Sequence, residues 1–142
     1  MTNAEGKLTT EGGSTVKHIE AADFNATELA SKAVLGVIDM HMRRRGGEIF
    51  WLVDNVFHDT CARPVWYPTI VIFEDGMMRH YSMATVQAER LADEFDRLLK
   101  TDAVRHSNAC HKYCQLYRDG LRSVVQEIAE FTAVAAVLET LH

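Results

Sequence analysis

The stretch from Tyr67 to Tyr81, YPTIVIFEDGMMRHY, constrains the fold more than any other part of the chain. A run of apolar β-forming residues comes first, and the pair Asp75-Gly76 separates it from a second strand-forming run. Asp-Gly between two such runs is typical of the tight turns that join right-twisted antiparallel strands. The sequence therefore predicts a β-hairpin with strands at 70–73 and 77–83, and the rest of the fold has to accommodate it.

Helical periodicity begins directly after the hairpin. From Thr85 to Leu99, apolar residues recur at three- and four-residue spacing, with acidic residues on the opposite side. Residues 101–142 are also helical in pattern, and their apolar stripe comprises Cys110, Cys114, Tyr117, Leu121, Val124, Val125, Ile128, Ala135 and Leu138. A straight helix of that length measures ~60 Å, about twice the width of a small domain. Either the chain bends at Asp119-Gly120, or its end projects to meet a partner.

The N-terminal part begins with a polar segment that has little to bury. Residues 1–15, rich in Thr, Gly and Asn, predict a flexible tail, and 15–19 predicts a short edge strand. Asn25 and Glu28 have the spacing of a capping box, in which the Asn side chain accepts from a backbone N–H of the first turn. A short helix over 26–32 is expected to follow.

Residues 33–40, AVLGVIDM, fit either a continuation of that helix or a strand buried on both faces. Gly36 favours the strand, because glycine costs roughly 1 kcal/mol relative to alanine inside a helix. Further along, 43–47 predicts a loop and 48–54 a strand. The segment 58–68 contains both prolines and is expected to be irregular.

Two blocks of the chain, in the correct order, resemble the thioredoxin-like superfamily. VKHIEAADFNATELASKAVLGVIDM, from Val16 to Met40, is similar to the family's opening strand, first helix and central strand. YPTIVIFEDGMMRHYSMATVQAERLADEFDRLL, from Tyr67 to Leu99, is similar to its proline-threonine, hairpin and final helix. The resemblance implies an α/β fold, with a mixed sheet of about four to five strands flanked by helices. It also implies a cis bond at Pro68; the alternative is a trans proline at the first residue of a strand, where its missing N–H is harmless.

This interpretation divides the chain into a tail at 1–15, an α/β core at 16–100 and a helical C-terminal extension at 101–142. The alternative is an α+β arrangement with an N-terminal helix, a three-stranded meander and C-terminal helices. The resemblance fails where the family's Cys-x-x-Cys belongs, because His41 to Gly47 contains no cysteine. A dithiol enzyme needs a thiolate of lowered pKa at a helix N-terminus, so we expect a redox-inactive protein.

A rival site lies in HSNACHKYC, residues 106–114. On a helix, His106, Cys110 and Cys114 lie one turn apart on one face, and His58 and Cys61 could approach them from the irregular segment. Two thiolates with one or two imidazoles suit tetrahedral zinc. Buried cysteine is also a common small hydrophobic residue. We therefore expect no cofactor, with zinc as the alternative.

Arginine and aromatic residues are enriched at binding hot spots. The candidate binding residues are Arg43, Arg44, Arg45, Trp51, Trp66, Tyr67, Pro68, Val125 and Ile128. The three consecutive arginines suit a phosphate or an acidic partner, because guanidinium offers a planar fork for bidentate contacts, although such a run in a loop is also commonly just solvated.

The net charge of −5 disfavours general binding to nucleic acid or to an anionic membrane. No apolar run is long enough to span a bilayer, and an odd count of three cysteines fits a reducing compartment, so we expect a cytoplasmic protein. No reactive group is assembled in the sequence. It therefore predicts a non-catalytic protein-binding module, such as a chaperone, an adaptor or an inhibitor, that meets a protein partner or a second copy through its C-terminal helices. Two alternatives stay open: a zinc-stabilised interaction domain, and a small thiol-dependent enzyme or redox switch that uses Cys61.

Overall fold

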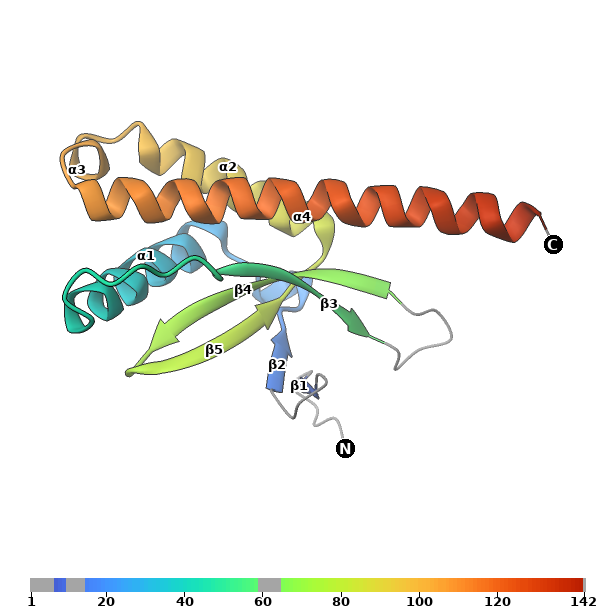
Figure 1. Ribbon diagram of the computed structural model, residues 1–142, viewed down its shortest axis with the longest axis horizontal. Helices are drawn as coiled ribbons and strands as arrows, with labels where there is room; N and C mark the ends of the chain where they lie inside the picture. The colour runs from blue at the N-terminus through green and yellow to red at the C-terminus, as the bar shows by residue number, and fades with distance from the viewer. Residues whose placement is uncertain (1–6, 10–14, 59–64, 142) are drawn as a thin grey trace.

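In the part of the chain that the structure describes, five strands form one mixed sheet in the order β1-β2-β5-β4-β3. The structure is a computed structural model that describes residues 7–9, 15–58 and 65–141. The strands are β1 (Lys7–Thr9), β2 (Thr15–His18), β3 (Val53–His58), β4 (Val65–Glu74) and β5 (Met77–Ser82). Of these strands, β2 and β5 pair in parallel, while β3, β4 and β5 form an antiparallel meander. Figure 1 shows the long helices gathered on one side of this sheet.

The expected hairpin is confirmed as β4 and β5. Asp75 and Gly76 form its two-residue turn, with φ of +53° and +74°. Positive φ at both central residues is the geometry that matches the right-handed twist of paired strands. The strand β4 is longer than predicted, since it begins at Val65 inside the segment expected to be irregular. Its residues from Pro68 to Phe73 are all buried.

The helix α1 (Ala26–Arg43) replaces the strand that was expected within residues 33–40. Asn25 caps it, accepting from the Glu28 backbone N–H at 3.0 Å as the capping pattern predicts. The physical reason for the wrong prediction is Gly36. A Cβ there would lie 2.2 Å from the Phe73 carbonyl oxygen, so glycine lets α1 approach the backbone of β4. The glycine that favoured a strand is in fact a helix–sheet contact.

The cis bond expected at Pro68 is also absent, because no peptide bond among the described residues is cis. Pro68 lies within β4, opposite Asn55 of β3. Its carbonyl accepts from the Met83 N–H at 3.0 Å, one residue after β5 ends. In an antiparallel strand the N–H and C=O of one residue point to the same side. The missing N–H therefore faces the end of β5, where it removes little pairing.

Several shorter segments also differ from expectation. β2 is an inner strand instead of an edge, because β1, within the segment expected to be a flexible tail, pairs with it. The third strand begins at Val53, later than the predicted 48–54. A 3₁₀ turn, η1 (Ala21–Asp23), precedes α1.

The mixed sheet, the flanking helices and the long C-terminal helix are confirmed. α1, the β3–β5 meander and the C-terminal helices correspond to the α+β alternative.

The C-terminal half consists of α2 (Thr85–Leu99), α3 (Asp102–Arg105) and α4 (Asn108–Thr140). α2 has the predicted bounds. α4 runs without a break through Gly120, where a Cβ would come within 2.8 Å of the Val53 Cβ. Gly120 thus permits close contact with β3 and does not bend the helix.

The first part of α4 is a core helix. Its buried residues are Tyr113, Cys114, Tyr117, Leu121, Val124 and Ile128. The Tyr117 ring stacks on Phe95 of α2 with centroids 4.9 Å apart, and its hydroxyl donates to the Val71 carbonyl at 2.6 Å. These contacts tie α4 to both α2 and the sheet. Among the described residues, none of the helices, α4 included, combines the length and apolarity that a bilayer crossing requires.

Candidate functional site

The end of α4 extends beyond the body of the domain (Figure 1). We call residues 129–141 the distal segment. Every residue in it is exposed, and at 1.5 Å per residue it is about 20 Å long. Its large apolar side chains keep 46–73% of their surface in solvent: Phe131, Val134, Val137, Leu138 and Leu141. Glu130 and Glu139 are its only charged residues. A contiguous, weakly charged apolar surface of this kind is characteristic of an interaction site.

The distal segment continues the same face that packs on the domain. At alternating three- and four-residue spacing this face comprises Leu121, Val124, Ile128, Phe131, Ala135 and Leu138. The first three residues are buried, and the last three are exposed. The apolar stripe is therefore longer than the part of α4 that packs against the domain.

An aromatic cluster lies where the distal segment leaves the domain. Phe57 of β3 and Trp66 of β4 are opposite each other in the strand register, with ring centroids 5.0 Å apart. Trp66 also contacts Phe131 of α4, at 6.3 Å. We call these three residues the aromatic corner. Each keeps more than a third of its surface exposed, from 37% for Trp66 to 46% for Phe131.

Only one of the predicted binding residues, Trp66, belongs to this surface. Ile128 is 6% exposed and Val125 packs partly against the core, so both support α4 from within the domain. Tyr67 is half-buried, with its ring 4.8 Å from that of His18, and Pro68 is buried. Phe57 and Phe131 are not among the binding residues predicted from the sequence. Phe131 had a usable signal, because it lies three residues after Ile128 and four before Ala135 on the predicted stripe.

The arginine run and Trp51 lie elsewhere. Arg43 ends α1 and pairs with Asp39 at 2.9 Å, while Arg44 and Arg45 are exposed in the turn that follows. Trp51, half-exposed before β3, contacts Phe73 at 6.1 Å. The structure does not bring these residues together with the aromatic corner.

Among the described residues, the alternative metal ligands His106, Cys110 and Cys114 form no metal site. Cys114 is buried, and burial raises the pKa of its thiol to about 11, with a further contribution from Cys110. A His106 ring nitrogen lies 2.8 Å from the Asp102 carbonyl, within its own turn. Among residues 7–9, 15–58 and 65–141, no group of three His, Cys, Asp or Glu residues has the arrangement of a metal site. Cys61 and the His58 side chain lie outside the described part.

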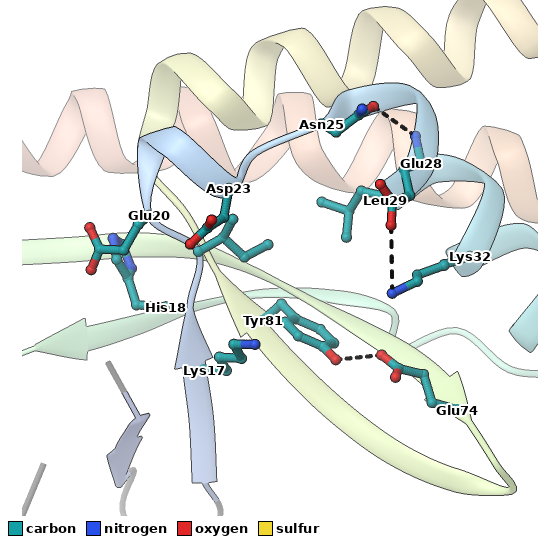
Figure 2. A pocket seen from close by; sticks show the side chains of 11 residues that line it. Lys17, His18, Glu20, Asp23, Asn25, Glu28, Leu29, Lys32, Glu74 and Tyr81 are labelled. Carbon is teal, nitrogen blue, oxygen red and sulfur yellow. Dashed lines mark hydrogen bonds and ion pairs between the residues drawn. The ribbon is translucent and has the colours of Figure 1, made fainter. Parts of the chain in front are cut away.

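A hollow of about 450 Å³ lies between β2, β5 and the start of α1. Figure 2 shows Leu29 and Lys32 reaching it from α1, Lys17 from β2, and Tyr81 beside Glu74 from the hairpin. The Tyr81 hydroxyl donates to Glu74. Burial, followed by this hydrogen bond, raises the pKa of Tyr81 to about 12. The phenol therefore stays protonated at neutral pH and acts as a donor.

The charges around this hollow are of both signs. Lys32 pairs with Glu28 at 4.0 Å, and both side chains are more than half exposed. On the β2 side, a His18 ring nitrogen lies 2.9 Å from the Ser82 hydroxyl. Burial lowers the pKa of His18, and Glu20 opposes the shift. Most side chains that line the hollow are charged or polar, so it suits polar contacts.

In comparisons with protein-family models, with curated proteins and with solved structures, nothing matches this chain. A relationship to the thioredoxin-like superfamily is thus neither confirmed nor contradicted by these comparisons. The class that the fold and the site define is a mixed α/β domain with a projecting apolar helix end.

Proposed function

We propose that this protein is a non-catalytic protein-binding module whose contact surface is the distal segment together with the aromatic corner. This surface suits the apolar face of another helix. That helix would lie along the distal segment and end beside Trp66. Helix-in-groove recognition uses anchors at three- and four-residue spacing, which is how the exposed apolar residues of α4 recur.

The observation that carries the proposal is that every residue from 129 to 141 is exposed, whereas the earlier part of the same helix is packed against the domain. Five large apolar side chains there are roughly half exposed. Covering the exposed halves would contribute on the order of 5 kcal/mol, at about 1.5–3 kcal/mol per fully buried side chain. Association itself costs several kcal/mol, so the surface supports a reversible complex.

The non-catalytic part of the proposal is supported by the state of the described reactive groups. The Cys114 thiol is protonated at neutral pH, because its pKa is raised to about 11. The Tyr81 phenol is protonated as well. A cytoplasmic setting is also part of the proposal, supported by the two free cysteines Cys110 and Cys114, which suit a reducing compartment.

Site-specific photocrosslinking tests this function even while the identity of the partner is open. A benzophenone side chain replaces Val134 in the distal segment, or Gln115, an exposed residue on the body of α4. We expect protein adducts from position 134 in purified protein, in extract of the native host, or in both, and few from position 115. Adding Phe131→Asp should abolish the adducts at 134. Equal yields at the two positions would contradict the proposal.

A further inference from the structure

The sequence of α4 from Ile128 to Leu141, IAEFTAVAAVLETL, has nearly the same pattern in both directions. When residues are paired from the two ends inward, the pairs are Ile128 with Leu141, Ala129 with Thr140, Glu130 with Glu139, Phe131 with Leu138, Thr132 with Val137, Ala133 with Ala136, and Val134 with Ala135. Apolar residues of the stripe always meet apolar residues. A two-fold symmetric interface demands this kind of self-complementarity, because the same patch serves both copies.

From this pattern we propose that the helix laid along the distal segment is that of a second copy of this chain, antiparallel to it, in a symmetric dimer. The inference rests on the proposed function and names its partner. With the two-fold axis between Val134 and Ala135, Phe131 of each copy lies opposite Leu138 of the other. The small side chain of Ala135 at the centre allows the helices to approach closely.

The charges of the distal segment are compatible with this pairing. Glu130 and Glu139 would lie at the same level in the two copies. They are nine residues apart, and at about 100° per residue they point to opposite flanks of the helix. A two-fold axis perpendicular to the helices keeps each flank on its own side. Glu130 of one copy and Glu139 of the other are therefore separated by the apolar seam.

The aromatic corner completes the interface. In this register Leu141 of the second copy lies level with Ile128, the last buried residue of α4. Beside that point are Phe131 and Trp66, whose rings are in contact and partly exposed. The end of each helix thus covers the corner of the other copy, and the ~20 Å distal segment keeps the two domains at opposite ends.

The interface is small. Each copy contributes the exposed residues of 129–141 that face the second helix, plus Phe57 and Trp66, which is well below the roughly 20–30 residues per side of a standard stable interface. We therefore expect a dissociation constant on the order of 10 µM.

Two alanine substitutions form a matched test. Ala135→Asp places a charge on the apolar stripe, and Ala133→Asp places the same charge two residues away, about 200° around the helix. Both positions are exposed, so neither change should disturb the domain, which thermal melts of both variants verify. By sedimentation equilibrium from 1 to 300 µM, we expect wild type to dimerise, Ala135→Asp to weaken dimerisation by about tenfold or more, and Ala133→Asp by less than about twofold.

Disulfide crosslinking tests the antiparallel register. Val134 lies nearest the axis, so Val134→Cys should form a dimer with itself under mild oxidation, above the background of the parent chain. Leu138→Cys should crosslink poorly with itself but readily with Phe131→Cys. Self-crosslinking of Leu138→Cys as efficient as that of Val134→Cys would indicate parallel helices and overturn the inference.

Equal effects of the two aspartates, or a wild-type monomer throughout the concentration range, would also overturn it. A wild-type monomer that still gives adducts at position 134 in extract, but none in purified protein, would remove the second copy as the partner. The proposed function would stand. The absence of adducts in both would remove the proposed function as well.

Discussion

Gly36→Ala is the change for which the structure predicts an effect opposite to that expected from helix propensity. In an isolated helix this substitution is stabilising by about 1 kcal/mol. Here the new Cβ would lie 2.2 Å from the Phe73 carbonyl oxygen, 3.1 Å from its carbonyl carbon and 3.3 Å from its nitrogen. All three are backbone atoms of a paired residue of β4, so no flexible side chain can move aside.

The cost follows from the shift that the clash requires. An ordinary carbon–oxygen contact is about 3.3–3.6 Å, so α1 has to move away from β4 by about 1 Å. That movement loosens the packing of Ala33 and Val37, which are fully buried on the same helix. Overpacking of a core typically costs about 1–3 kcal/mol, and a backbone clash belongs at the upper end or beyond. After subtracting the gain in helix propensity, we expect a net loss of about 2 kcal/mol.

Urea denaturation and thermal melts followed by circular dichroism measure this effect. For a chain of this size, 2 kcal/mol corresponds to a fall in melting temperature of about 4–8 °C. Gly47→Ala is the control, because its Cβ would meet only ordinary contacts of 3.4 Å; we expect a change within about 0.5 kcal/mol. A Gly36→Ala variant that is more stable than wild type would refute the close contact between α1 and β4.

Three further predictions concern stability and titration. Val125→Asp should destabilise the domain by about 1–3 kcal/mol, because Val125 packs partly against the core. Val134→Asp is the control and should leave the melting temperature unchanged. Equal melting temperatures of the two variants would place both residues outside the core. Tyr81 has a pKa raised to about 12 from 10.0, so its contribution to stability is complete below pH 10 and is lost as pH rises towards 12. Tyr81→Phe should accordingly reduce the loss of stability between pH 10 and 12. It should also remove one phenol that ionises at high pH from the titration followed by absorbance at 295 nm. An unchanged titration curve would contradict the raised pKa. Tyr117→Phe removes the buried hydrogen bond to Val71 and should cost about 1 kcal/mol in urea melts, so full stability would argue against that bond.

The candidate site was predictable from sequence only in part. The apolar stripe of α4 is a local pattern, so it was visible as a helix longer than a small domain needs. The sequence did not show which residues of the stripe are exposed, because their exposure depends on where the packed body of the domain ends. The body covers Val124 and Ile128 and leaves Phe131 and Leu138 exposed. The sequence interpretation therefore placed Val125 and Ile128 at the interface, although they belong to the domain.

The aromatic corner depends entirely on tertiary structure. Phe57 and Trp66 meet because the β3–β4 register sets them opposite each other, and Phe131 joins them because α4 crosses that end of the sheet. No short-range pattern relates three residues so far apart in the chain.

Local sequence signals were sufficient for three elements: the hairpin at Asp75-Gly76, the cap at Asn25, and the helix from Thr85 to Leu99. Tertiary packing determined the rest. Gly36 was interpreted as a strand signal, and Gly120 left two alternatives, a bend or a projecting helix end, because glycine weakens an isolated helix. In the folded protein both glycines lie inside unbroken helices, where the missing side chain lets the helix backbone approach a strand. The gain from that close packing outweighs the loss of helix propensity, and only the three-dimensional structure shows which of the two effects is larger.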